Sequence, residues 1–125
     1  MKLRFLCLAA LSAFAVSAPV LAHHTHANFD QSRFIELNGT VKEMRWMNPH
    51  VWFYMVVADD KGQDVPWSME GGSTAALTRG GWTRDSIKAG DKVTVRCHPQ
   101  KDGTRGCLMG FVTSINGAAM DKKFD

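Results

Sequence analysis

Residues 51–57 read Val-Trp-Phe-Tyr-Met-Val-Val and carry the strongest strand signal in the chain. Nearly every position is β-branched or aromatic and both faces are apolar, which predicts a central β-strand. Residues 59–62, Asp-Asp-Lys-Gly, then predict a turn, and residues 64–70 return with alternating apolar and polar side chains. Because Pro66 has no amide hydrogen to donate, we expect it to face an open edge or a bulge.

Further elements are predicted on both sides of this pair of strands. Upstream, residues 35–46 alternate with one change of phase, which predicts a bulged strand that can bend sharply at Gly39. Downstream, Ser73 is a predicted N-cap for a short helix over residues 74–79, which two glycines end. Residues 83–87 allow a second helical turn.

Two more alternating runs, residues 93–97 and 107–115, complete the predicted elements. The resulting order is three strands, a short helix and two strands, which predicts a mainly β fold. The plan is that of a small OB-like five-stranded barrel with a short helix between strands 3 and 4. A six-stranded or open variant is an alternative. An immunoglobulin-like sandwich would need about seven strands, and helix signals stand where some of them would have to be.

The first 22 residues predict a cleavable signal peptide. Lys2 and Arg4 supply its positive start, residues 5–16 its apolar run, and Ala22 the small residue before the cleavage site. That apolar run is shorter than the roughly 20 residues that cross a bilayer, so we expect no stable membrane insertion after cleavage. The predicted location is therefore periplasmic or secreted.

We expect four parts along the chain: the signal peptide at 1–22, a histidine-rich N-terminal arm at 23–33, the barrel at 34–118 and a C-terminal tail at 119–125. Removal of the signal peptide lowers the formal net charge from +3 to +1. Acidic residues are interspersed with the basic ones, so the charge pattern argues against nucleic acid as a partner.

Two cysteines, Cys97 and Cys107, remain after cleavage. An even pair in an oxidising compartment predicts a disulfide, and the proline and glycines of residues 98–106 are typical of a hairpin loop. A dithiol metal site is the alternative, but the ten-residue offset does not match a Cys-x-x-Cys ligand pair.

The histidine cluster after the predicted cleavage site indicates metal binding. Cleavage after Ala22 would give His23 a free α-amino nitrogen, which can chelate a cation together with its own imidazole. His24, His26 or His50 would add a further nitrogen. This ligand type favours copper, and zinc or nickel less. The alternative is a disordered arm that binds metals weakly and without a role.

A second group of candidate residues surrounds Asn48-Pro49-His50 and is predicted to bind a ligand. Asn48 lies at the turn between the first two strands, which in an OB-type barrel borders the binding face. Trp46, Trp52 and Trp67 would form a stacking platform if they were exposed on that face. The alternatives are that His50 bonds the backbone of its own turn and that the tryptophans pack in the core.

The chain also resembles a known family. The motifs that carry the resemblance are His23-His24-Thr25-His26, Leu37-Asn38-Gly39-Thr40-Val41, Trp46 with Asn48-Pro49-His50, and Gly81-Trp82-Thr83-Arg84-Asp85 ahead of Gly90-Asp91. The family is one of small exported bacterial proteins, a domain of unknown function, whose members usually begin His-His-Ser-Phe. The resemblance implies a periplasmic β-rich domain and brings no established activity.

Taken together, these patterns predict a periplasmic protein that binds Cu(II) or a similar cation. No nucleophile, base and oxyanion set emerges from the sequence, so we expect binding rather than catalysis. The alternative is an OB-like module that binds a small organic ligand, an oligosaccharide or a protein without metal.

Overall fold

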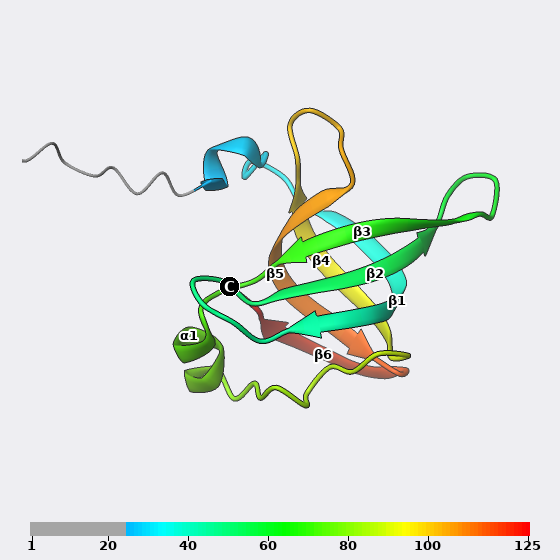
Figure 1. Cartoon of the computed structure of the whole chain (residues 1–125). Helices are drawn as coiled ribbons and strands as arrows, with labels where there is room; N and C mark the ends of the chain where they lie inside the picture. The colour runs from blue at the N-terminus through cyan, green and yellow to red at the C-terminus, as the bar shows by residue number, and fades with distance from the viewer. Residues whose placement is uncertain (1–24) are drawn as a thin grey trace, which may run out of the picture.

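The computed structural model describes residues 25–125, so the predicted signal peptide, His23 and His24 lie outside the described residues (Figure 1). The elements in chain order are η1 (Thr25–Asn28), β1 (Ile35–Arg45), β2 (Trp52–Ala58), β3 (Asp64–Glu70), α1 (Thr74–Arg79), β4 (Lys92–Pro99), β5 (Gly106–Ile115) and β6 (Ala118–Lys123). No helix within residues 25–125 is long and apolar enough to cross a membrane.

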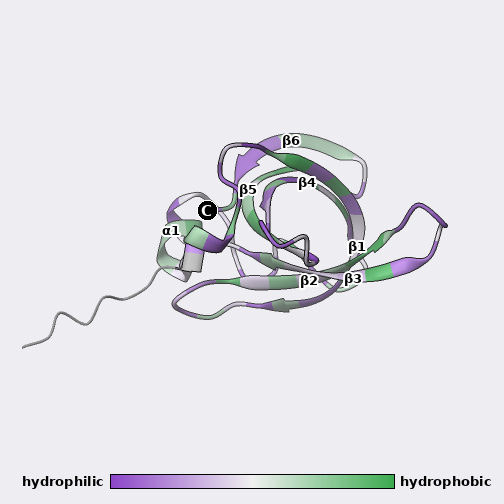
Figure 2. Cartoon of the chain, turned by 90° about the horizontal axis from the view of Figure 1, so that it is seen from above, coloured by the Kyte–Doolittle hydropathy of each residue, from purple (hydrophilic) through white to green (hydrophobic). Residues whose placement is uncertain are grey.

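The strands form a closed barrel of five, with a sixth strand added at one side. Their order is β3-β2-β1-β4-β5-β6, and a parallel pairing between β3 and β5 closes the ring (Figure 2). The helix α1 lies between β3 and β4 in the chain. The predicted OB-like five-stranded barrel is therefore confirmed.

The bend of β1 allows this one strand to pair on both sides. Its first half, from Ile35 to Thr40, pairs with β4, and its second half pairs with β2 through a bulge between Val41 and Glu43. Gly39 stands at the change of partner, where a Cβ atom would lie 2.6 Å from the carbonyl oxygen of Val56. Only glycine permits that approach, which explains the predicted bend.

Pro66 lies where the sequence predicts an open edge. It pairs with Val56 of β2, while the pairing of β3 with β5 begins only at Ser68. The missing amide hydrogen of Pro66 therefore costs the barrel no ladder hydrogen bond with β5.

The core fills the inside of the barrel with alternate residues of the strands. The largest fully buried side chains include Phe53, Met55, Met69, Met109 and Phe124. Cys97 and Cys107 belong to this core and form the predicted disulfide, which joins β4 to β5 with a Cα–Cα distance of 5.6 Å.

The structure differs from the sequence prediction at two places. Residues 83–87 form a turn rather than a second helix, because the Lys88 amide donates to the Asp91 carboxylate at 2.8 Å instead of to the Arg84 carbonyl that a continuing helix would use. The expected tail, residues 119–125, belongs to the fold. Asn116 and Gly117 both have positive φ and connect β5 to β6 as a two-residue hairpin loop, and Phe124 is 1% exposed.

Candidate metal centre

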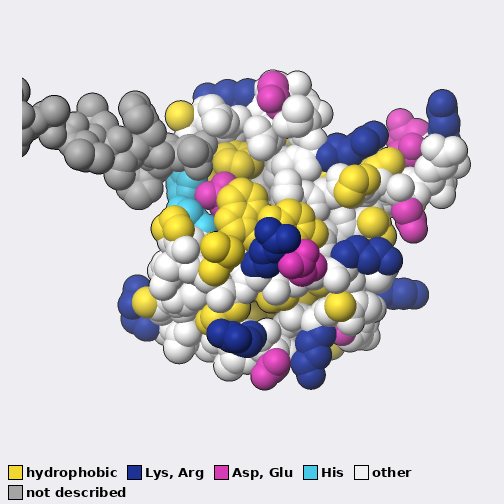
Figure 3. All heavy atoms as spheres, in the orientation of Figure 1, with side chains coloured by type: hydrophobic (Ala, Val, Ile, Leu, Met, Phe, Trp, Pro, Cys, Tyr) yellow, Lys and Arg dark blue, Asp and Glu magenta, His cyan; other side chains and the backbone are white. Residues whose placement is uncertain are grey.

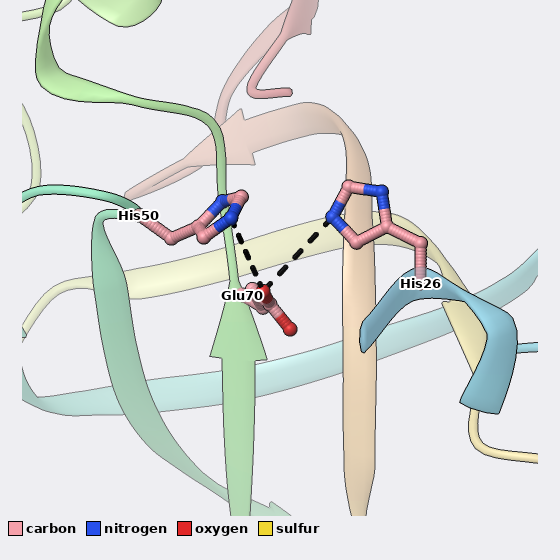
Figure 4. Close-up of side chains that lie close together, drawn as sticks. All are labelled: His26, His50 and Glu70. Atoms are coloured by element: carbon pink, nitrogen blue, oxygen red, sulfur yellow. Dashed lines mark ion pairs between the residues drawn. The ribbon is translucent and has the colours of Figure 1, made fainter. Parts of the chain in front are cut away.

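Three side chains converge at the end of β3 (Figure 4). The Nε2 atom of His50 lies 3.8 Å from Oε1 of Glu70, and the Nε2 atom of His26 lies 4.0 Å from the same oxygen. The two imidazole rings meet edge to face, with 5.5 Å between their centroids. All three ligand atoms lie within 4.8 Å of one another.

Glu70 is the last residue of β3 and the centre of the group. It is 2% exposed and is the one buried charged residue in the part of the chain that the structure describes. A buried carboxylate is costly unless it is paired, hydrogen-bonded or bound to a metal. Two imidazoles face this carboxylate, and a cation bound between the three groups would supply the positive partner that its burial requires.

His50 is oriented by a hydrogen bond on the far side of its ring. Its Nδ1 lies 3.0 Å from the carbonyl oxygen of Gly71. Because a carbonyl can only accept, Nδ1 carries the hydrogen in the neutral ring, and the lone pair is on Nε2. That lone pair belongs to the atom nearest Glu70, and such backbone support is typical of metal-binding histidines.

The backbone around His50 is joined to the turn that follows Glu70. The Val51 amide donates to the Gly72 carbonyl and the Gly71 amide donates to the Val51 carbonyl, both at 2.8 Å. The Gly72 amide donates to the Phe124 carbonyl at 3.1 Å. Cβ atoms at Gly71 and Gly72 would lie 2.7 Å from atoms of residues 124 and 125, so side chains are excluded there. The C-terminus therefore supports the turn that orients His50.

Asn48 connects the same loop to α1. Its Oδ1 accepts from the Thr74 amide at 3.1 Å and from the Thr74 hydroxyl at 2.9 Å. Asn48 thus satisfies an amide in the first turn of the helix in addition to the Ser73 hydroxyl, which accepts from the Ala76 amide. The structure gives Asn48 a structural role in the loop that presents His50, and its predicted contact with a ligand stays a prediction.

His26 comes from the N-terminal segment, which lies against the β4–β5 connection (Figure 1). Phe29 is 5% exposed and bridges to Gln100, the Asp30 amide donates to the Pro99 carbonyl at 2.8 Å, and the Lys101 amide donates to the Asn28 carbonyl at 2.9 Å. The His26 side chain is 36% exposed, although its Nε2 atom is shielded from solvent. The predicted N-terminal arm therefore lies against the barrel from His26 onward.

A second polar motif stiffens this segment. The Asp30 carboxylate accepts from the Ser32 hydroxyl at 2.5 Å and from the Arg33 guanidinium at 3.0 Å. The hydrogen bonds from the hydroxyl and amide of Ser32, assisted by Arg33, hold the pKa of the Asp30 carboxyl below its usual range. Asp30 is therefore ionised in the folded protein at neutral pH.

The three donors suit a divalent transition metal. Two ligands bound at about 2.0–2.1 Å with tetrahedral angles are roughly 3.3–3.5 Å apart. The separations of 3.8 and 4.0 Å around Glu70 are slightly wider, so a small inward movement of the imidazoles would close the site on an ion. Two imidazoles and one carboxylate form a ligand set that zinc, copper and iron all accept, and they leave a further position open.

Other predicted site residues lie in different environments. Trp46, Trp52 and Trp67 are all partly buried. Trp46 and Trp67 pack against the core, and Trp52 is directly opposite Glu70 in the β2–β3 register. Glu70 was not predicted as a ligand from the sequence. The signal that could have identified it is a carboxylate at the end of a predicted strand. The chain reverses direction after that strand, beside the loop of His50.

One comparison with known proteins gives a match. The model of a family described as a family of unknown function, DUF6152, matches residues 10–109. No curated protein and no solved structure matches the chain.

Proposed function

Because the chain belongs to this family of unknown function, we propose a function from the site itself: the protein binds a divalent transition metal through His26, His50 and Glu70. The observation that carries the proposal is the convergence of two imidazoles on a carboxylate that is 2% exposed. The His50 ring is already held in the tautomer that a metal requires.

Copper is the favoured ion. The stability order of divalent metals places Cu(II) above Ni(II) and Zn(II) for nitrogen and oxygen ligands. His23 precedes His26 by three residues, so its nitrogens are within about 10 Å of His26 along an extended chain. If cleavage follows Ala22, the α-amino group and imidazole of His23 would occupy the open positions and strengthen the preference for Cu(II). His24 is the other candidate for the added imidazole.

We place this binding in the periplasm or outside the cell. The predicted signal peptide argues for export, and the Cys97–Cys107 disulfide is of the kind that persists in oxidising compartments. A site built to hold an ion, with His50 fixed by backbone and Glu70 buried, supports storage, transfer or buffering of the metal without a reaction of its own.

The test is isothermal titration of the mature protein with Cu(II) and Zn(II). Glu70→Gln keeps the shape of the side chain and removes the anionic ligand, and His50→Gln removes an imidazole. We expect each variant to lose at least 10- to 100-fold in affinity, because each removes a direct ligand. Glu36→Gln is the matched control for Glu70→Gln, since Glu36 is an exposed carboxylate of β1 opposite Arg96 of β4 and should leave the affinity unchanged. Binding unaffected by both site variants would refute the proposal.

The copper preference needs a separate experiment. An extra glycine before His23 moves the terminal amine by one residue and leaves His26, His50 and Glu70 in place. We expect Cu(II) affinity to fall by tenfold or more and Zn(II) affinity to change little. Equal effects on the two metals would show that His23 gives no selectivity for copper.

A further inference from the structure

The outer surface of β2 and β3 places an aromatic side chain next to the candidate metal centre. In the β2–β3 register Trp52 is opposite Glu70, and Tyr54 is opposite Ser68. Side chains of directly opposed residues share a face and lie about 4.5–5.5 Å apart at Cβ. Phe53 and Met69, which alternate with them, point into the core and are 0% exposed. Trp52 and Glu70 therefore share the outer face.

The same face continues away from the metal centre as a fixed aromatic surface. The guanidinium of Arg45 lies 5.0 Å from the centroid of the Tyr54 ring and is held at 2.8 Å by Glu43. Figure 3 shows hydrophobic side chains gathered beside the histidines on this view of the molecule. In OB-type barrels the face of strands 2 and 3 is the surface that binds ligands.

The chemistry of the two parts differs and is complementary. Zn(II) held by His26, His50 and Glu70 without His23 keeps a net positive charge, because Glu70 is its one charged ligand, and has an open position for an anionic donor. Arg45 offers no second anion site, because Glu43 already neutralises it. Trp52 offers a π-face for a planar ring.

We infer that the metal centre and Trp52 together bind a small planar aromatic ligand that carries an anionic metal-binding group. The anionic group takes the open position on the metal, and the ring stacks on the Trp52 indole. This inference rests on the proposed metal binding and names the class of ligand for that site. In this inference the metal and the aromatic surface bind one ligand together, whereas in the sequence-based predictions metal binding and ligand binding by the tryptophans were alternatives.

The test uses two hydroxamates with the same metal-binding group. Benzohydroxamate carries a ring and acetohydroxamate does not, so the ratio of their affinities isolates the contact with the ring. With Zn(II)-loaded protein we expect benzohydroxamate to bind about tenfold more tightly than acetohydroxamate, the range that stacking on one aromatic side chain gives. Trp52→Ala should abolish this ratio and leave acetohydroxamate affinity unchanged, and Trp52→Phe should keep most of it.

Each outcome separates this inference from the proposal beneath it. Zinc titration comes first, and its failure in the wild type contradicts the metal centre itself. If zinc binds and the two hydroxamates bind equally, or Trp52→Ala weakens both alike, the metal centre stands and the aromatic contact is refuted. Equal benzohydroxamate binding with and without zinc would assign the aromatic face a ligand independent of metal and also overturn the inference.

Discussion

His50 and His26 face the same oxygen of Glu70 from two very different supports. His50 stands in a loop whose backbone bonds to residues 71 and 72, and its Nδ1 is held by Gly71. His26 stands in a four-residue 3-10 helix near the start of the described chain, with its side chain 36% exposed. One imidazole is positioned by the body of the protein and the other by a peripheral segment.

The two ends of the chain explain this difference. Near the C-terminus, Phe124 is 1% exposed, packs edge to face on Trp82 and Phe53, and donates its amide to Gly110. Near the N-terminus, one buried side chain, Phe29, and a few backbone bonds hold the segment of His26. The centre thus has a rigid half, Glu70 with His50, and a conditional half that depends on docking of the N-terminal segment.

The largest effect is expected from a substitution that removes the support of the rigid half, Glu70 with His50. Phe124→Ala removes a fully buried ring that contacts Gly71, so we expect a loss of about 3–5 kcal/mol in the free energy of unfolding, measured in urea. Metal affinity should fall as well, because the turn that orients His50 loses its support. Phe34→Ala is the matched control, since Phe34 is 46% exposed and should cost less than about 2 kcal/mol. Equal losses would contradict the importance of the C-terminus.

The barrel could be predicted because each of its signals is local. The alternating run of β2, the bend at Gly39 and the cap at Ser73 act within a few residues, and the structure confirms all three. The sixth strand also had a local signal, Asn116-Gly117, which is the preferred loop of a two-residue hairpin. Its shortness and exposure concealed it, because four of the six residues of Ala118–Lys123 are exposed and none is buried.

The candidate site was predictable only in part, because long-range contacts create it. His50 and His26 could be proposed from residue type. Glu70 could not, because alternation places it on the polar face of β3 with Asp64 and Ser68, where a carboxylate normally meets water. Its burial follows from two segments that are distant in sequence, the loop of His50 and the segment of His26.

A smaller effect compares the two imidazoles directly. His50→Ala and His26→Ala each remove one ligand, but His50 stands in a loop bonded to the body of the barrel, with its Nδ1 held by the Gly71 carbonyl, whereas His26 stands in the N-terminal segment. Binding through His26 must also order the N-terminal segment. The entropy cost of that ordering offsets part of the binding free energy that His26 contributes. We expect the Zn(II) affinity of His50→Ala to be about tenfold lower than that of His26→Ala. The reverse order in titration calorimetry would show that the N-terminal segment is the better organised half.

The smallest effect concerns Asp30, whose hydrogen bonds stiffen the N-terminal segment that carries His26. Asp30→Asn keeps an oxygen for Ser32 and loses the ion pair with Arg33, so docking of the segment should weaken slightly at neutral pH. Folding lowers the pKa of Asp30, so its contribution is present above its unfolded value of about 3.9 and is lost as the pH falls through the folded value.

The difference between wild type and Asp30→Asn should therefore be full at pH 6 and disappear only as the pH falls through the folded pKa of Asp30, which lies below its ordinary value. The reporter is the NMR shift of the Lys101 amide in metal-free protein, because that amide donates to Asn28 of the docked segment. Asp91→Asn is the matched control: hydrogen bonds from the Asn116 side chain and the Lys88 amide lower the pKa of Asp91 in the same way, and Asp91 is not a neighbour of Lys101 in the chain. The absence of any shift difference at pH 6 would assign the docking to Phe29 and the backbone alone, and the conditional half would then be insensitive to acid.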